Sequence, residues 1–405
     1  MSPRALGTIA LALLLGMGHP ATLEVEVLPE ATLRFAVSHA AVAEQDGVIY
    51  VLGGYSDEAD AIEGVTARAH WYDVRTEEQG DLLSLPFPVA EAAAVIHDGY
   101  LYVAGGRLPD DADLLEEIGV ESASDVTAWW DLPDCESFGG GVVNHVHRLR
   151  LEQPTTWEEQ PSMTMPRAGH VLVADGPRLI ALGGVYDPTD CDLTLAEQEC
   201  DLTVAEDRST SIGPCTLRYA ESLEAPGATW RRDDAYLLKA TRADFAALVF
   251  PDQLLALGGF AAGAGANAAC GPGCLERVRR FGVHHPADLL ADRGDVSVEG
   301  WGFEILDTPP VPIHRTSGAV LGGTAFFLSW ETEDKPARLV AYDTVDGAWA
   351  QADLDGEYTG ARLVASDGDL WVAGGQRDGG PSDALLRLEV SLAPDVSGGC
   401  GGAVF

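Results

Sequence analysis

Basic residues are scarce in this sequence. Its 405 residues include 25 lysines and arginines against 64 aspartates and glutamates, and Lys239 and Lys335 are the only lysines. The formal net charge at pH 7 is therefore −39. Such a chain lacks the positive surface that attracts phosphate backbones and anionic lipids. The charge balance argues against a nucleic-acid partner, and it favours cations, basic partners or simply a solvated acidic surface.

Long apolar runs are missing after the N-terminus. Residues 1–21 combine Arg4, an apolar run over Ala5–Leu15 and small residues within Gly16–Ala21, which is the pattern of a secretory signal peptide. An apolar core strand is the alternative interpretation of this segment. No later run approaches the roughly 20 residues of a membrane span. We therefore expect an extracytoplasmic protein (secreted, periplasmic or at the cell surface) without a membrane span.

Local catalytic signatures are also missing. The sequence has no HExxH, no GxSxG and no phosphate-binding loop. His145 and His147 alternate on a predicted strand, which puts both side chains on one face, and His284-His285 lies near Asp288. Either pair can ligate a metal, but exposed or core histidines explain both more simply.

What the sequence does contain is a repeated pair of strands that ends in two glycines. The clearest copy is 166–184, PRAGHVLVADGPRLIALGG, in which an Asp-Gly turn joins two short strands. Asp-Gly suits a tight hairpin, and a glycine pair lets backbones approach closely. The second strand recurs as VIYVLGG (48–54), YLYVAGG (100–106), QLLALGG (253–259) and DLWVAGG (369–375), and without glycines as AFFLSW (325–330).

These repeats resemble kelch motifs, which build β-propellers. The first two glycine pairs are about 50 residues apart. In four of the repeats a tryptophan follows later in the repeat, at Trp157, Trp230, Trp301 and Trp349. The resemblance implies an all-β, six-bladed kelch-like β-propeller over 22–392, followed by a Gly-rich tail at 393–405. The blades are expected to begin near residue 36 and to end near residues 88, 165, 240, 312, 358 and 392.

The last blade would hold only three strands if it used the C-terminal segment alone. A ring that stays open leaves two sheet edges unpaired, which is costly and prone to aggregation. The segment 22–27 aligns with the outer strand of blade two. We therefore expect this N-terminal strand to complete the last blade and close the ring.

Three long loop insertions, at about 107–140, 185–215 and 260–276, follow the glycine pairs of blades two to four. In kelch-like propellers such loops share one rim with the loops that enter the innermost strands, and long loops on a rigid scaffold often carry function. The insertions hold six of the seven cysteines, and exported chains favour disulfides. The expected pairs are Cys191–Cys200, Cys270–Cys274 and Cys135–Cys215, with a zinc site as the alternative and Cys400 left over.

Two of the insertions are rich in carboxylates, at 109–117 (PDDADLLEE) and 187–192 (DPTDCD). Calcium takes six or more oxygen ligands, and acidic loops can supply them. Neither run matches a known calcium loop, and solvated acidic loops explain both. We therefore expect no cofactor, with calcium as the alternative.

The resemblance also implies ligand-binding residues at the mouth of the central channel, where kelch proteins often place arginines. Arg167 and Arg242 each lie sixteen residues before a glycine pair, and Arg315 is near the equivalent position. His170 follows Arg167 by three residues, and Glu91 supplies a carboxylate. Guanidinium groups around one opening can bind a carboxylate or a sulfate. The alternative is that each arginine pairs with a carboxylate of a neighbouring blade and holds the ring together.

Two functions fit these features. The first hypothesis is a monomeric protein- or glycan-binding module that acts through its looped, disulfide-stapled face without catalysis. The second is a mutarotase- or epimerase-like enzyme, similar to bacterial sialic-acid mutarotases, in which Glu91, Arg167 and Arg242 would transfer protons on a sugar at the channel mouth. Copper radical oxidases of the galactose-oxidase kind do not fit, because the cysteines lie in insertions and not beside a core tyrosine.

Overall fold

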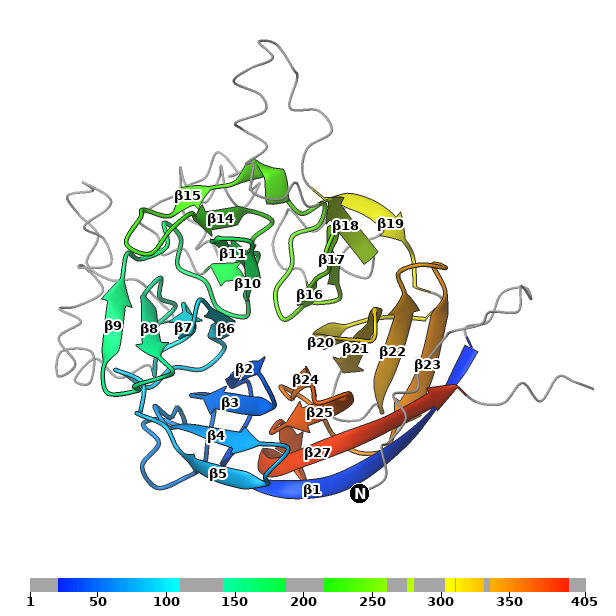
Figure 1. Ribbon diagram of the computed structural model, residues 1–405, viewed down its shortest axis with the longest axis horizontal. Helices are drawn as coiled ribbons and strands as arrows, with labels where there is room; N and C mark the ends of the chain where they lie inside the picture. Colours follow the sequence, from blue (N-terminus) through cyan, green and yellow to red (C-terminus); the bar gives the residue numbers. More distant parts are fainter. Residues whose placement is uncertain are drawn as a thin grey trace, which may run out of the picture.

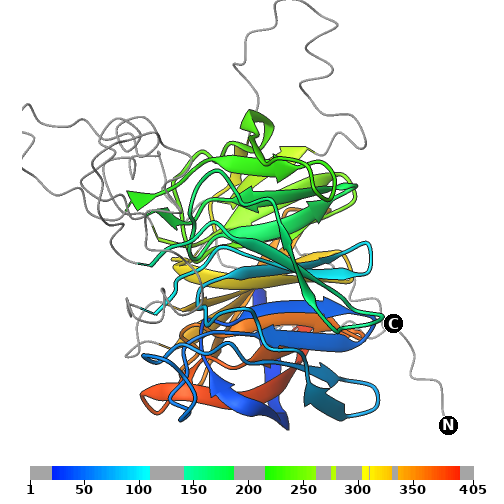
Figure 2. The same cartoon turned by 90° about the vertical axis from the view of Figure 1, so that its left-hand side faces the viewer.

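The chain folds into six blades of four antiparallel strands that surround a central axis (Figure 1), and blades five and six are joined at their outer edges into one sheet. The computed structural model describes residues 21–109, 141–186, 215–260, 275–279, 303–309, 311–330 and 336–392. Seen from the side, the strands run between the two faces of the ring (Figure 2). The prediction of an all-β, six-bladed propeller is confirmed.

The blades follow one another in chain order, each from its innermost to its outermost strand, except that the outermost strand of blade six is the N-terminal β1. Blade one comprises β2 (Ala41–Gln45), β3 (Val48–Leu52), β4 (Ala69–Asp73) and β5 (Glu78–Asp81), and blade two comprises β6 (Ala93–His97), β7 (Tyr100–Ala104), β8 (Val146–Arg150) and β9 (Trp157–Gln160). Blade three comprises β10 (Val171–Asp175), β11 (Arg178–Leu182), β14 (Ala220–Leu223) and β15 (Arg231–Arg232), and blade four comprises β16 (Ala246–Val249), β17 (Gln253–Leu257), β18 (Leu275–Arg279) and β19 (Glu304–Asp307). Blade five comprises β20 (Arg315–Leu321), β21 (Thr324–Trp330), β22 (Ala337–Asp343) and β23 (Trp349–Leu354), and blade six comprises β24 (Arg362–Ser366), β25 (Asp369–Ala373), β27 (Gly380–Leu392) and β1 (Ala21–Val37). The short strands β12 (Val185–Tyr186), β13 (Cys215–Thr216) and β26 (Gln376–Arg377) and the 3-10 helix η2 (Asp234–Tyr236) accompany them.

The ring closes through the N-terminal strand. β1 pairs with β27 in antiparallel fashion from Leu23↔Leu392 to Val37↔Ser382, and the two strands run side by side along the outer edge in Figure 1. The first residues of β1, Ala21 and Thr22, also pair in parallel with β23 of blade five. The expected closure by an N-terminal strand is therefore confirmed.

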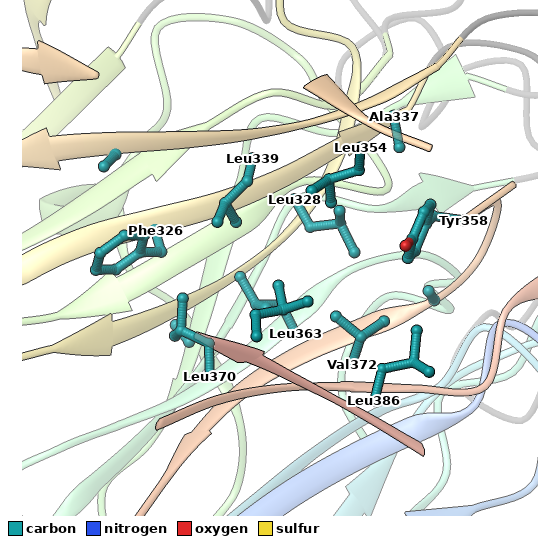
Figure 3. Close-up of a cluster of buried hydrophobic side chains, with 14 of the residues drawn as sticks. Phe326, Leu328, Ala337, Leu339, Leu354, Tyr358, Leu363, Leu370, Val372 and Leu386 are labelled. Carbon is teal, nitrogen blue, oxygen red and sulfur yellow. The ribbon is translucent and has the colours of Figure 1, made fainter. Parts of the chain in front are cut away.

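The hydrophobic core lies between the blades. In the described residues, six buried apolar clusters each join two neighbouring blades. Figure 3 shows the cluster between blades five and six, where Leu328 and Leu339 face Leu363 and Leu370. Because the faces of adjacent sheets bury one another's apolar side chains, every blade depends on both neighbours for its core.

The glycine pairs serve the contact between blades. The second glycine donates its N–H to the carbonyl of a residue entering the next blade, as Gly106 does to Arg167 at 2.7 Å and Gly184 to Arg242 at 2.9 Å. A Cβ atom on Gly105, the first glycine of this pair, whose φ is +58°, would lie 2.5 Å from the carbonyl oxygen of Arg167 in the segment that enters blade three. The motif therefore marks places where two backbones meet without room for a side chain.

Several predictions fall outside the described residues. These are the signal peptide up to residue 20, most of the three insertions with their acidic runs, the pair His284-His285, the Gly-rich tail, and Cys135, Cys191, Cys200, Cys270, Cys274 and Cys400. Cys215 begins β13, and its expected partner is among those residues. The part of the chain that is described contains no helix with the length and hydropathy needed to cross a membrane.

Candidate functional site

The loops that enter the innermost strands lie in a ring around the channel, and backbone hydrogen bonds link them in series from blade six through blade one to blade five. The backbone N–H of His39 donates to the carbonyl of Gly360 (2.8 Å), and the backbone N–H of Glu91 donates to the carbonyl of His39 (3.0 Å). The backbone N–H of Gly169 donates to the carbonyl of Glu91 (2.9 Å). The N–H of Asp244 then donates to Gly169 (2.7 Å), and that of Thr316 to Asp244 (2.9 Å). These bonds connect all six blades and fix the positions of the residues that surround the channel mouth.

Three polar residues of this ring adopt a backbone conformation that L-residues usually avoid. The φ angles are +52° at His39, +56° at Glu91 and +50° at Asp244. The left-handed region is disfavoured by about 1–2 kcal/mol for most residues, although Asp tolerates it better. Gly169 and Gly360 occupy the equivalent positions of blades three and six. The ring thus holds one imidazole and two carboxylates where other blades have glycine, which points to a role for these side chains.

Glu91 is held by two residues that directly follow glycine pairs. The hydroxyl of Tyr55 donates to Oε1 of Glu91 at 2.7 Å, and Nε of Arg107 lies 3.6 Å from Oε2. Burial, reinforced by the charge of Glu91, raises the pKa of Tyr55, so the phenol stays protonated and keeps donating. Blades one and two therefore fix one carboxylate at the mouth.

Asp244 is a second carboxylate on the other side of the ring, with only 6% of the residue exposed. Its Oδ2 lies 3.1 Å from Nη1 of Arg315, and the guanidinium of Arg315 stacks 4.4 Å from the centre of the Phe260 ring. Burial, followed by the charge of Glu91, raises the pKa of Asp244, while Arg315, Arg362 and Arg107 act in the opposite direction. The five charged groups therefore form one electrostatic cluster.

Arg362 brings blade six into this cluster. Its Nε donates to the carbonyl of Ala40 in blade one at 2.9 Å, and burial lowers the pKa of the guanidinium from its usual value. His39 stands beside it. Burial, followed by the charge of Arg362, lowers the pKa of His39 to about 4, so its imidazole is neutral near pH 7.

A cavity of about 110 Å³ continues from the mouth along the innermost strands. Its lining comes from all six blades and includes His170, Asp244, Thr316, Ser317 and Arg362 among small and apolar residues. In Figure 1 the innermost strands β2, β6, β10, β16, β20 and β24 surround this axis.

The structure does not bring Arg167 and Arg242 to the mouth, which corrects the position expected for them. Both are fully buried and outside the lining of the cavity. Nη2 of Arg167 lies 2.6 Å from Oε1 of Glu221, and Arg242 pairs in the same way with Glu276. Each carboxylate belongs to the third strand of the arginine's own blade, so these pairs also differ from the expected bridges between neighbouring blades.

The structure does bring Glu91, Arg315 and His170 to the mouth and the channel. Their binding role remains a prediction. The structure also places Tyr55, Arg107, Asp244 and Arg362 at the mouth, and these residues were not expected there from the sequence. A signal for one of them exists in the sequence: Asp244 precedes Gly258 by fourteen residues, as Glu91 precedes Gly105 and Arg315 precedes Ser329.

His145 and His147 do not extend the site. His145 and His147 both lie on one face and pack against Phe87, with ring centroids at 5.6 and 5.3 Å. Within the described ranges, no group of three or more His, Cys, Asp or Glu side chains is arranged to hold a metal ion. The arginine-rich mouth is instead suited to an anionic group.

Comparisons with known proteins agree with the fold. No protein-family model matches the chain. The Kelch-like protein terF of Aspergillus terreus (strain NIH 2624 / FGSC A1156) is 38% identical over 90 residues, which are 22% of this chain and 20% of that protein. The match therefore spans about a fifth of the relative's length. A solved structure, that of YjhT, matches 89% of this chain and 99% of its own with a TM-score of 0.57 and 14% identity, a likeness that concerns the fold alone.

Proposed function

We propose that this six-bladed kelch-repeat β-propeller is a binding module for a glycan or protein ligand that presents an anionic group to the channel mouth. The ligand can be sought on the face of the propeller where the blade-entry loops meet. The observation that carries this proposal is the charge of the mouth. Arg107, Arg315 and Arg362 come from three blades and outnumber the carboxylates Glu91 and Asp244, in a chain whose net charge is −39.

The connections expected to carry the long insertions begin beside the mouth. Tyr55, Arg107 and Phe260 directly follow glycine pairs, where the connections between second and third strands begin, and all three contact mouth residues. A ligand bound at the mouth therefore meets guanidinium groups in the centre and aromatic side chains beside them, a combination that suits acidic sugars and acidic peptide segments. Export, disulfide stapling and a monomeric state remain predictions that accompany this proposal.

Isothermal titration calorimetry tests the binding role. We expect hexuronic acids, other carboxylated sugars or acidic peptides to bind at least tenfold more tightly than their neutral counterparts. Arg315→Gln removes the guanidinium of a side chain that is 38% exposed, and it should weaken carboxylate binding about tenfold or more. Arg338→Gln is the matched control, since Arg338 pairs with Asp353 on β22 and β23, away from the mouth. Equal binding of charged and neutral ligands, or of wild type and Arg315→Gln, would contradict the proposal.

A second candidate function is proton transfer on a sugar at the same mouth, and Asp244 favours it. This carboxyl is buried, its pKa is raised, and an arginine lies 3.1 Å away, which is the environment of a general acid. The comparisons do not reach this level of detail, so the enzyme remains the alternative to the binding module.

Anomer interconversion, followed by NMR on carboxylated sugars, distinguishes the two functions. If the mouth is catalytic, Asp244→Asn should slow the catalysed exchange at least 100-fold while sugar binding persists, because Asn tolerates the left-handed backbone and keeps the side-chain shape. No acceleration by the wild-type protein over buffer, with binding intact, would leave the non-catalytic module as the function.

A further inference from the structure

Five of the six junctions between neighbouring blades share two backbone hydrogen bonds at the mouth. The first joins the two segments that enter the innermost strands, as from the N–H of Gly169 to the carbonyl of Glu91 (2.9 Å). The second joins a glycine pair to the segment that enters the next blade, as from the N–H of Gly106 to the carbonyl of Arg167 (2.7 Å). Both bonds recur at every junction from blade six through blade one to blade five. These junctions are therefore fixed at the mouth by the backbone alone.

The junction between blade five and blade six differs, because its described residues form neither of these bonds. Blade five has Ser329-Trp330 in place of a glycine pair. Its strand β20 begins at Arg315 itself and pairs there with Trp330, whereas the innermost strands of the other blades begin two residues after the equivalent position. A side chain provides the link instead: the N–H of Leu363 donates to Oγ of Ser317 at 2.8 Å. The apolar cluster shown in Figure 3 and the pairing of β1 with β23 still hold the two blades together, so the difference concerns the mouth end.

Two arginines of the mouth stand on the two sides of this junction. Arg315 begins β20 of blade five, and Arg362 begins β24 of blade six. The charges of both act on Asp244 and on His39, which places the two guanidiniums in the same part of the mouth. Nη1 of Arg315 lies 3.1 Å from Oδ2 of Asp244. Nε of Arg362 donates to the carbonyl of Ala40, whereas its Nη1 and Nη2 have no hydrogen-bond partner among the described residues and are not among the buried polar atoms, so solvent reaches them.

Positive charge is in excess at this junction. Burial lowers the pKa of Arg362, while the charges of Asp244 and Glu91 raise it, so a further counter-ion would stabilise the guanidinium. A carboxylate of a ligand has two oxygens, and each can accept a charge-assisted hydrogen bond from one guanidinium. One carboxylate can therefore contact both arginines and connect blade five to blade six.

We propose that the anionic group of the ligand bridges Arg315 and Arg362 and thereby supplies the second polar link at the mouth end of the junction between blades five and six. This inference rests on the proposed anion-binding role of the mouth, and it adds the position of the anion and a consequence of binding. The ligand tightens one junction of the ring and leaves the five others unchanged. Because coupling is reciprocal, loosening this junction must weaken the binding of the ligand.

Hydrogen exchange followed by mass spectrometry on the full chain tests the bridge, with glucuronate as the probe and glucose as its neutral counterpart. We expect glucuronate to slow exchange about threefold or more in peptides that contain Leu363, and to leave peptides that contain Gly169 unchanged. Ser317→Ala removes the side-chain link without removing a charge. It should speed the exchange of Leu363 in the free protein, weaken glucuronate binding, and leave a larger protection on binding than in the wild type.

The variant Arg362→Gln should weaken glucuronate binding about tenfold or more and abolish the protection at Leu363. Arg338→Gln, away from the mouth, should retain both, and far-UV circular dichroism confirms that each variant is folded. Glucuronate binding without protection at Leu363 would overturn the bridge and leave the binding module intact. So would a tenfold loss in Arg107→Gln without a loss in Arg362→Gln, because the anion would then lie elsewhere in the mouth. An absence of anion binding in the calorimetry would overturn both proposals.

Discussion

Replacing Glu221 with glutamine should lower the free energy of unfolding by about 3–5 kcal/mol, because it leaves the charge of Arg167 buried without its counter-ion. Both side chains are almost completely buried, at 0% and 2% exposure, and Nη2 of Arg167 lies 2.6 Å from Oε1 of Glu221. Glu221 also accepts the N–H groups of Thr164 (2.6 Å) and Met165 (3.0 Å), so the change weakens the attachment of the loop that enters blade three.

Urea denaturation followed by circular dichroism measures this effect. The exposed pair Arg148–Glu158, with a distance of 2.7 Å but a glutamate that is 45% exposed, is the control. Glu158→Gln should cost less than about 1 kcal/mol, because solvent screens that pair. Adding Arg167→Met to Glu221→Gln should recover part of the loss, since the unpaired charge is then gone. A loss below about 1 kcal/mol for Glu221→Gln would show that the buried pair does not stabilise the blade.

The same pair also positions the site. Arg167 donates to the carbonyls of Gly183 (2.8 Å) and Tyr219 (3.0 Å), which fixes the loop two residues before Gly169 enters the hydrogen-bonded ring. Arg242 stands in the same relation to Asp244, through Glu276 and the carbonyl of Gly258 (3.2 Å). The arginines that the sequence suggested as ligand-binding residues thus support the neighbouring residues that surround the channel.

The fold could be predicted from the sequence because its signals are local. A glycine pair marks a close approach between blades, and that requirement acts on the backbone of the pair itself, as at Gly105. The closure of the ring followed from counting strands, since an open edge is unfavourable whatever the side chains are. Blade five shows that the strand pattern alone suffices, because β21 ends in Ser329-Trp330 and still pairs with β20 and β22.

The site was only partly predictable because its contacts join distant segments. The spacing to the glycine pair located Arg167 in the sequence, but its partner Glu221 lies 54 residues further along the chain. That spacing does not tell whether the Arg167 side chain points toward the strand of Glu221 or toward the channel. Arg362 joins the electrostatic environment of Asp244 only when blade six has closed the ring. Asp244 itself could have been predicted from the sequence, since it precedes its glycine pair by the same number of residues as Glu91 does.

Acid should destabilise the wild-type protein more than the variant His170→Phe. Burial and the charge of Arg167 lower the pKa of His170 to about 3, whereas a histidine of the unfolded chain titrates near 6.5. Between pH 3 and pH 6.5 the unfolded chain binds a proton on His170 that the folded protein does not bind. The contribution of His170 to the free energy of unfolding is therefore complete above pH 6.5 and is lost as the pH falls. At pH 4 the loss from this one residue amounts to about 3 kcal/mol.

The free energy of unfolding, measured in urea at pH 7, 6, 5 and 4, isolates this contribution as the difference between wild type and His170→Phe. The carboxylates and His39, whose pKa is also lowered, to about 4, are common to both proteins and cancel. The free energy of unfolding of the wild type, minus that of His170→Phe, should therefore fall by about 3 kcal/mol between pH 7 and pH 4. Parallel curves would mean that the folded protein accepts the proton on His170, which requires a partner for the imidazolium that the two buried ring nitrogens do not have among the described residues.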